Sequence, residues 1–71
     1  MIAKPPIDPR RYGKLLAKIL PGVIETEEEN ERMLVAIEPL FDKGKDRTPE
    51  EDRLYKLMLH LITDFEDKHY D

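Results

Sequence analysis

The sequence predicts a small all-α protein, a three-helix unit in which two of the helices form an antiparallel hairpin. Apolar residues recur at spacings of three and four along three segments, which is the period of one helix face. Two Thr-x-x-Glu sequences mark helix starts. Charged residues make up 39% of the chain and aromatic residues 7%, a balance that favours helices over sheet. We therefore expect helices near 9–20, 27–43 and 49–69 in a single domain spanning 1–71.

The segment 49–69 has the strongest helical pattern. Thr48 and Glu51 form a capping box, and Pro49 suits the first helical position. Tyr55 and Leu59 lie beside the main apolar stripe and widen the apolar arc to roughly 200°, more than one packed face needs. This helix is therefore expected to bury two surfaces, one of them against a partner, unless the helix near 9–20 covers Tyr55 and Leu59. The stripe itself comprises Leu54, Leu57, Met58, Leu61, Ile62 and Phe65.

The segment 27–43 begins with a second capping box, between Thr26 and Glu29. Pro39 lies inside the pattern and should kink or loosen the last turn, and Gly44 suits the position that ends the helix. The connection 44–47 is short, which predicts that this helix and the next pair as an antiparallel hairpin. The expected apolar stripe comprises Met33, Leu34, Ile37, Leu40 and Phe41, with Ala36 at its edge.

The first helix is expected between Asp8, an N-cap residue, and the helix-ending pair Pro21-Gly22. One face is apolar, and the opposite face carries four basic side chains. We call these four the basic stripe, and they admit three interpretations: a solvated face, an anion-binding surface, or a contact with acidic residues of this or a neighbouring chain. The apolar face comprises Tyr12, Leu15, Leu16, Ile19 and Leu20, and the basic stripe comprises Arg10, Arg11, Lys14 and Lys18.

Charge is unevenly distributed along the chain. The net charge is −4, but residues 1–20 carry five basic side chains against Asp8 alone, whereas residues 21–71 carry seven basic and fifteen acidic side chains. The acidic part argues against DNA binding, which requires neutralisation of phosphates, and suits a basic protein partner. The chain has no membrane-spanning apolar run, no secretory signal pattern and no cysteine, so we expect a cytoplasmic protein.

The residue types that usually carry out catalysis are scarce. The chain contains neither Cys nor Ser, so the usual nucleophiles are missing, and no glycine-rich phosphate loop is present. His60 and His69 are nine residues apart, too far to bind one metal from one helix. The glutamate run 25–31 lacks the glycine-containing pattern of a calcium loop and suits a capped helix start. We therefore expect no enzyme activity, no cofactor and no metal site.

Three stretches of the chain resemble a known family. They are MIAKPPIDPRRYGKLLAKILP at 1–21, VIETEEENERML at 23–34 and DRTPEEDRLYKLMLHLITDFEDKHY at 46–70. In this order they resemble the N-terminal domain of HigA-family antitoxins, which carry a helix-turn-helix module. The resemblance covers nearly the whole chain, with 35–45 matching less distinctively.

The resemblance implies a role in a toxin–antitoxin system. Antitoxins of this family neutralise a partner toxin, usually a small basic mRNA endonuclease. They also act as transcription regulators that repress their own operon through a C-terminal helix-turn-helix module. The chain ends at Asp71, about where that module would begin, so it is interpreted as a domain of a longer protein. DNA binding is therefore not assigned to these residues.

The first hypothesis is a toxin-binding or dimerising N-terminal domain of a HigA-like antitoxin. A domain of this size buries only about 60% of its unfolded surface, so self-association through Tyr55, Leu59 or Ile62 is expected. Whether the third helix binds a second copy or the toxin stays open. Two alternatives are a stand-alone helical oligomerisation module and a nucleic-acid binder that uses the basic stripe. The candidate partner-binding residues are Tyr55, Leu59, Ile62, Glu27, Glu28 and Glu31.

Overall fold

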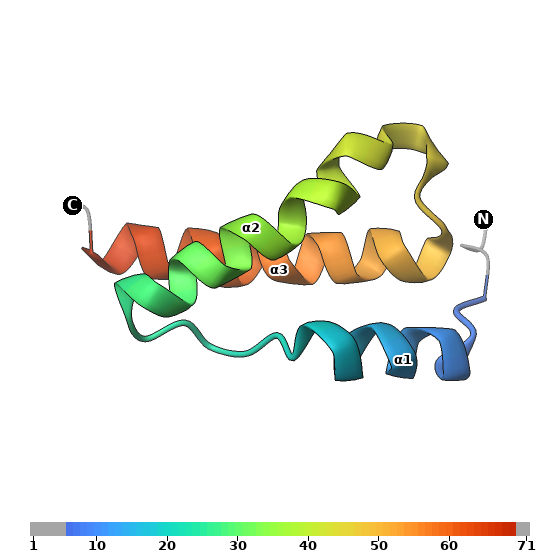
Figure 1. Ribbon diagram of the computed structural model, residues 1–71, viewed down its shortest axis with the longest axis horizontal. Helices are drawn as coiled ribbons and strands as arrows, with labels where there is room; N and C mark the ends of the chain where they lie inside the picture. Colours follow the sequence, from blue (N-terminus) through green and yellow to red (C-terminus); the bar gives the residue numbers. More distant parts are fainter. Residues whose placement is uncertain (1–5, 70–71) are drawn as a thin grey trace, which may run out of the picture.

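The computed structural model describes residues 6–69, and within them the chain forms three α-helices and no β-strand. The helices are α1 (Pro9–Ile19), α2 (Glu27–Lys43) and α3 (Pro49–His69), and a 3₁₀ turn, η1 (Gly44–Asp46), joins the last two. Figure 1 shows α2 and α3 running in opposite directions, with α1 beside α3 and running the same way as α3. The predicted all-α class and all three helix ranges are confirmed.

Local side-chain contacts set the helix starts, as the capping boxes predicted. Thr26 Oγ1 accepts a hydrogen bond from the Glu29 amide at 3.1 Å, and Glu29 Oε1 accepts one from the Thr26 amide at 3.1 Å. The Thr48 and Glu51 pair makes the same reciprocal bonds at the start of α3.

Backbone conformation sets the helix ends. Gly44 ends α2 with φ +53°, a conformation that favours glycine. α2 continues past Pro39 to Lys43, and its C-terminal part leans away from α3 (Figure 1).

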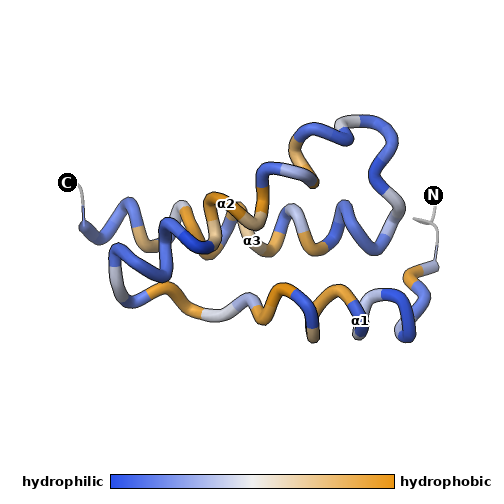
Figure 2. Tube along the Cα trace, viewed as in Figure 1, coloured by the Kyte–Doolittle hydropathy of each residue, from blue (hydrophilic) through white to orange (hydrophobic). Residues whose placement is uncertain are grey.

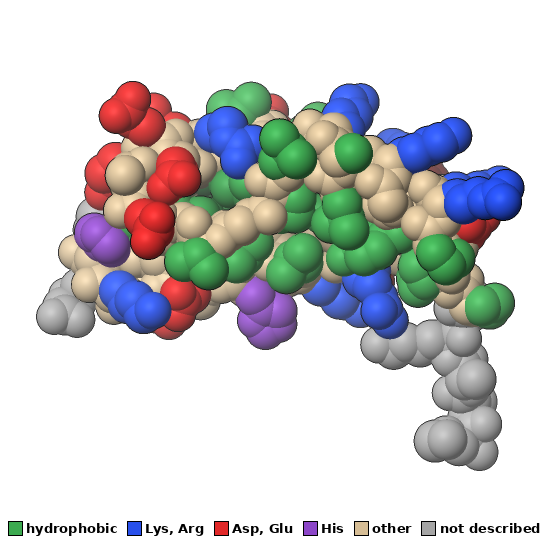
Figure 3. Space-filling view, turned by 90° about the horizontal axis from the view of Figure 1, so that it is seen from below, with side chains coloured by type: hydrophobic (Ala, Val, Ile, Leu, Met, Phe, Trp, Pro, Cys, Tyr) green, Lys and Arg blue, Asp and Glu red, His purple; other side chains and the backbone are tan. Residues whose placement is uncertain are grey.

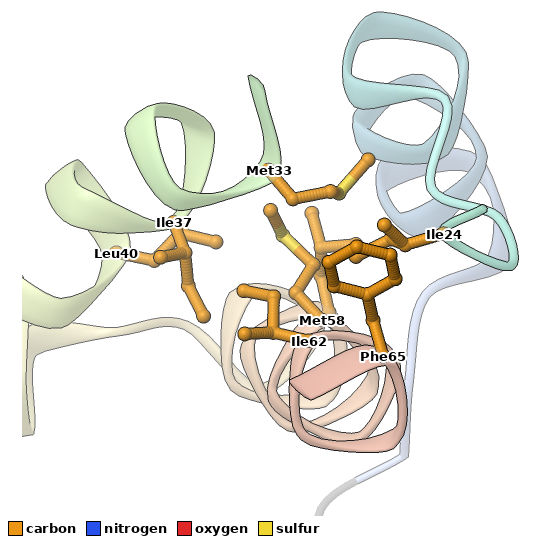
Figure 4. Close-up of a cluster of buried hydrophobic side chains, with 8 residues drawn as sticks. Ile24, Met33, Ile37, Leu40, Met58, Ile62 and Phe65 are labelled. Carbon is orange, nitrogen blue, oxygen red and sulfur yellow. The ribbon is translucent and has the colours of Figure 1, made fainter. Parts of the chain in front are cut away.

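The core lies between α2 and α3. Figure 2 shows hydrophobic positions gathered where these two helices cross and along α1. α1 contributes no fully buried side chain, and its apolar face packs against the core only partly buried. The close-up in Figure 4 shows side chains from α2, α3 and the segment before α2 pointing toward one another. The buried hydrophobic residues are Ile24, Met33, Ile37, Leu40, Leu54, Met58, Ile62 and Phe65.

Polar side chains of the hairpin hold α1 at both of its ends. The buried carboxylate of Glu50, in the first turn of α3, accepts a hydrogen bond from the Asp8 amide at 2.8 Å. At the other end, the guanidinium of Arg32 donates to the carbonyls of Ile19 at 2.9 Å and Leu20 at 3.2 Å. Carbonyls at the end of a helix lack partners within the helix, so Arg32 satisfies groups that would otherwise need water.

The first turn of α3 should make the fold sensitive to acid. The hydrogen bond from the Asp8 amide holds the pKa of Glu50 below the usual range of a glutamate. Hydrogen bonds from Lys43 and Lys56 similarly lower the pKa values of Glu51 and Asp52. Because these carboxylates bind protons more tightly in the unfolded chain, their contribution is complete above the unfolded pKa, about 4, and is lost as pH falls through the lower folded values.

We predict that Glu50→Gln reduces stability at pH 7 and flattens its decrease between pH 5 and pH 3. A neutral amide still accepts from the Asp8 amide, but more weakly, and it removes one titrating group. Urea unfolding followed by circular dichroism at stepped pH values measures both effects. Glu38→Gln, at an exposed position of α2, is the matched control. If the stability of Glu50→Gln depended on pH as that of the parent does, the Glu50 carboxylate would not be a source of the acid sensitivity.

Candidate functional site

The contact between α2 and α3 has two edges, and α1 lies along one of them. Arg32, which precedes the core residue Met33, points toward α1 and binds its last carbonyls. A residue one position after a core residue is rotated about 100° around the helix axis in the opposite sense. Because α2 and α3 are antiparallel right-handed helices, this rotation brings the following residues of both helices to the same edge, away from α1.

The edge away from α1 carries four apolar or aromatic residues, which we call the seam patch. Leu34 and Phe41 follow Met33 and Leu40 on α2, and Tyr55 and Leu59 follow Leu54 and Met58 on α3. Phe41 is 65% exposed, Leu34 42% and Leu59 40%, while Tyr55 is half-buried. α1 therefore does not cover Tyr55 and Leu59, and the described chain leaves an apolar strip along the hairpin. The seam patch comprises Leu34, Phe41, Tyr55 and Leu59.

Tyr55 is partly engaged within the chain. The guanidinium carbon of Arg47 lies 4.0 Å from the centre of the Tyr55 ring, a cation–π contact. Arg47 is itself held by hydrogen bonds to the Leu40 carbonyl at 2.8 Å and to Asp52 at 3.3 Å. One face of the Tyr55 ring is therefore already occupied. The other three members of the seam patch are the stronger candidates for apolar anchors.

Acidic side chains border the seam patch along α2, and we call them the acidic rim. Glu38 is four residues after Leu34 and three before Phe41, so it lies beside both on the helix surface. Asp42 is four residues after Glu38 and continues the same line. A negative border of this kind attracts a basic partner and disfavours an acidic one. The acidic rim comprises Glu27, Glu31, Glu38 and Asp42, all exposed.

The structure separates the six residues that the sequence proposed for partner binding. Tyr55 and Leu59 belong to the seam patch, and Glu27 and Glu31 belong to its rim. Ile62 is buried in the core beneath the patch, so it is not a surface residue of this chain. Glu28 lines one hollow with Glu31, Arg32 and Val35, so it lies further around α2 from the seam patch. These six residues therefore do not form one continuous surface.

Sequence reasoning placed Leu34 and Phe41 in the core stripe and missed them as surface residues. The signal was the pairs Met33-Leu34 and Leu40-Phe41, because adjacent helical residues point about 100° apart and only one member of such a pair can point to the centre of the core. Burial of Met33 and Leu40 in the core turns their neighbours outward.

A hollow of about 650 Å³ lies beside η1, and Arg47 in its lining also contacts Tyr55 of the seam patch. Its lining includes four basic side chains and one carboxylate, Asp52, which pairs with Arg47 at 3.3 Å and Lys56 at 3.0 Å. Within residues 6–69, no group of three His, Cys, Asp or Glu side chains is placed to hold a metal ion. No helix among these residues is long and apolar enough to cross a membrane.

Comparison with known proteins found no matching protein-family model, no matching curated protein and no matching solved structure.

The assignment of surface and core predicts different costs of truncation for neighbouring residues of α3. Met58→Ala should lower the free energy of unfolding by about 2–5 kcal/mol, because it leaves a cavity in the core. Leu59→Ala should cost less than about 1 kcal/mol, because the side chain is already partly solvated. Chemical denaturation of the two variants compares them directly. A larger loss in Leu59→Ala than in Met58→Ala would contradict the assignment of the seam patch as surface.

Proposed function

We propose that this chain is the toxin-binding N-terminal domain of a HigA-like antitoxin and transcription regulator. Its partner is a basic mRNA-endonuclease toxin, which the domain neutralises by binding. Two independent lines support the proposal: the resemblance over 1–21, 23–34 and 46–70, and the exposed seam patch with its acidic rim.

The seam patch is the observation that carries the proposal. Leu34, Phe41 and Leu59 expose apolar area along the hairpin, and removal of such area from water on binding is favourable. The acidic rim beside them would raise the rate of encounter with a basic protein. Together they match a basic partner that presents an apolar ridge.

The acidic rim also affects whether the seam patch binds a toxin or a second copy of the chain. Two copies that met through their seam patches about a two-fold axis would place the same surface against itself. If the axis sets α2 of one copy against α2 of the other, the two acidic rims lie close together, and like charges across an interface oppose association. A basic toxin suits the seam patch better than a second copy does. The alternative function, a stand-alone oligomerisation module, requires the seam patch to bind a second copy of the chain in preference to a toxin.

Co-expression with the protein encoded by the adjacent gene tests the proposal. We expect the two proteins to co-purify and to elute together from a sizing column. Leu34→Asp combined with Leu59→Asp should abolish the complex while the far-ultraviolet circular dichroism of this chain stays helical. Val35→Asp, on α2 but outside the seam patch, is the matched control. A complex that survives the double substitution would overturn the assignment of the seam patch.

Binding kinetics should separate the two parts of the site. Leu59→Ala should speed dissociation by roughly fivefold to thirtyfold, equivalent to about 1–2 kcal/mol, because it removes an apolar anchor. Glu31→Lys with Glu38→Lys should slow association and weaken its salt dependence, because charges act over a Debye length of about 8 Å in physiological salt. Stopped-flow measurements with purified toxin resolve both rates.

Glu28→Lys, outside the acidic rim and further from the seam patch, is the control for the two charge reversals and should slow association less. An association rate that responds to neither salt nor the reversals would remove the steering role. An unchanged dissociation rate in Leu59→Ala would remove the anchor.

A further inference from the structure

A second exposed apolar surface lies where α1 ends and α2 begins. Val35 is 71% exposed, and Leu20 and Val23 are each 67% exposed. Leu20, Val23 and Arg32 line one hollow, and Arg32 and Val35 line a second, so the three apolar residues surround Arg32. We call Leu20, Val23 and Val35 the corner patch. Leu20 and Val23 lie beside the end of α1, and Val35 lies on the outer surface of α2, in one hollow with Arg32 and the acidic-rim residue Glu31.

The corner patch is held in place by specific contacts. Arg32 donates to the carbonyls of Ile19 and Leu20, which fixes the end of α1 against α2. Leu20 has φ +52° and ψ +57°, and it is the one residue other than glycine with positive φ among those described. A glycine would adopt this conformation without strain, but the glycine nearby is Gly22, two residues later. The backbone is therefore strained at Leu20, where the side chain is exposed to solvent.

The face that includes α1 carries charges of both signs, but at opposite ends. Figure 3 shows Lys and Arg side chains mostly toward one end, Asp and Glu side chains toward the other, and hydrophobic side chains between them. The basic end contains the basic stripe of α1, whose four members are all exposed. The acidic end contains Glu25, which precedes α2, and Glu28 in the first turn of α2, both of them exposed. A half-turn about an axis through the middle of this face exchanges the two ends.

We propose that this face binds a second copy of the chain in an antiparallel arrangement. The two corner patches meet near the two-fold axis, and the basic stripe of each copy lies against the acidic start of α2 in the other. A closed two-fold dimer requires a surface that is complementary to itself, and this distribution of charge satisfies that requirement. A partner surface that carries charge of only one sign would be complementary to only one end of this face.

The arrangement leaves the seam patch exposed in both copies. Self-association and toxin binding therefore use different apolar patches. The inference does not depend on the proposed function, because it is tested on this chain alone with no toxin present.

Sedimentation velocity over a range of concentrations tests the apolar part. We expect a reversible dimer, weakened by high salt, whose dissociation constant rises roughly tenfold or more in Val35→Asp. Val35 is so exposed that the substitution should leave the fold intact, which a thermal melt checks. Leu59→Asp, on the seam patch, is the matched control and should dimerise as the parent does. A parent that is monomeric at high micromolar concentration, or equal loss in both variants, would overturn the proposal.

A charge exchange tests the antiparallel geometry. Lys14→Glu with Lys18→Glu removes the net charge of the basic stripe, and Glu25→Lys with Glu28→Lys removes most of the negative charge of the acidic end. Neither double variant should dimerise well alone, but their mixture should form a mixed dimer in which opposite charges meet at both ends. Native mass spectrometry with one variant labelled with ¹⁵N detects the mixed species.

Lys45→Glu, in η1, is the control for a single change of net charge and should not affect dimerisation. Two double variants that dimerise as well as the parent, or a mixture that forms no mixed dimer, would overturn the antiparallel arrangement. Loss of toxin binding with dimerisation intact would instead count against the proposed function, so the two failures are distinguishable.

Discussion

Packing between α2 and α3 is the constraint on which the rest of the structure depends. Leu54, Met58, Met33 and Phe65 are the largest fully buried side chains, and all four come from these two helices. α1 contributes no fully buried side chain. It packs against the hairpin of α2 and α3, which already contains the centre of the core. In a small domain with little interior, such a hairpin has only two edges, and one helix can cover only one of them. The exposed seam patch follows directly from this geometry.

The position of α1 is decided by a few polar contacts as well as by apolar packing. Glu50 binds the start of α1 and Arg32 binds its end, and both side chains come from the hairpin. Each contact satisfies backbone groups that the helix itself leaves without partners. These bonds place the basic stripe on the outside of the molecule and the end of α1 against α2. The same contacts therefore cover one edge of the hairpin and create the corner patch.

The two exposed apolar surfaces differ in the charges around them, and this difference separates their proposed partners. The seam patch has an acidic border along α2, which favours a basic partner. The corner patch lies between regions of opposite sign, which favours contact with an identical surface after a half-turn. An apolar area alone would not distinguish these cases, because hydrophobic burial is not directional. The charged residues at the borders supply the specificity.

By itself, the sequence determined the three helices, their limits and the uneven charge. These features are local: a capping box spans three residues, and the apolar period is read within one helix. Only the tertiary structure decided which apolar residues stay exposed. Leu34 and Phe41 belong to the predicted core stripe but face solvent, whereas Ile62, expected at the surface, is buried. The reason is that exposure depends on where α1 packs, and that is set by contacts between residues far apart in the chain, such as Asp8 with Glu50.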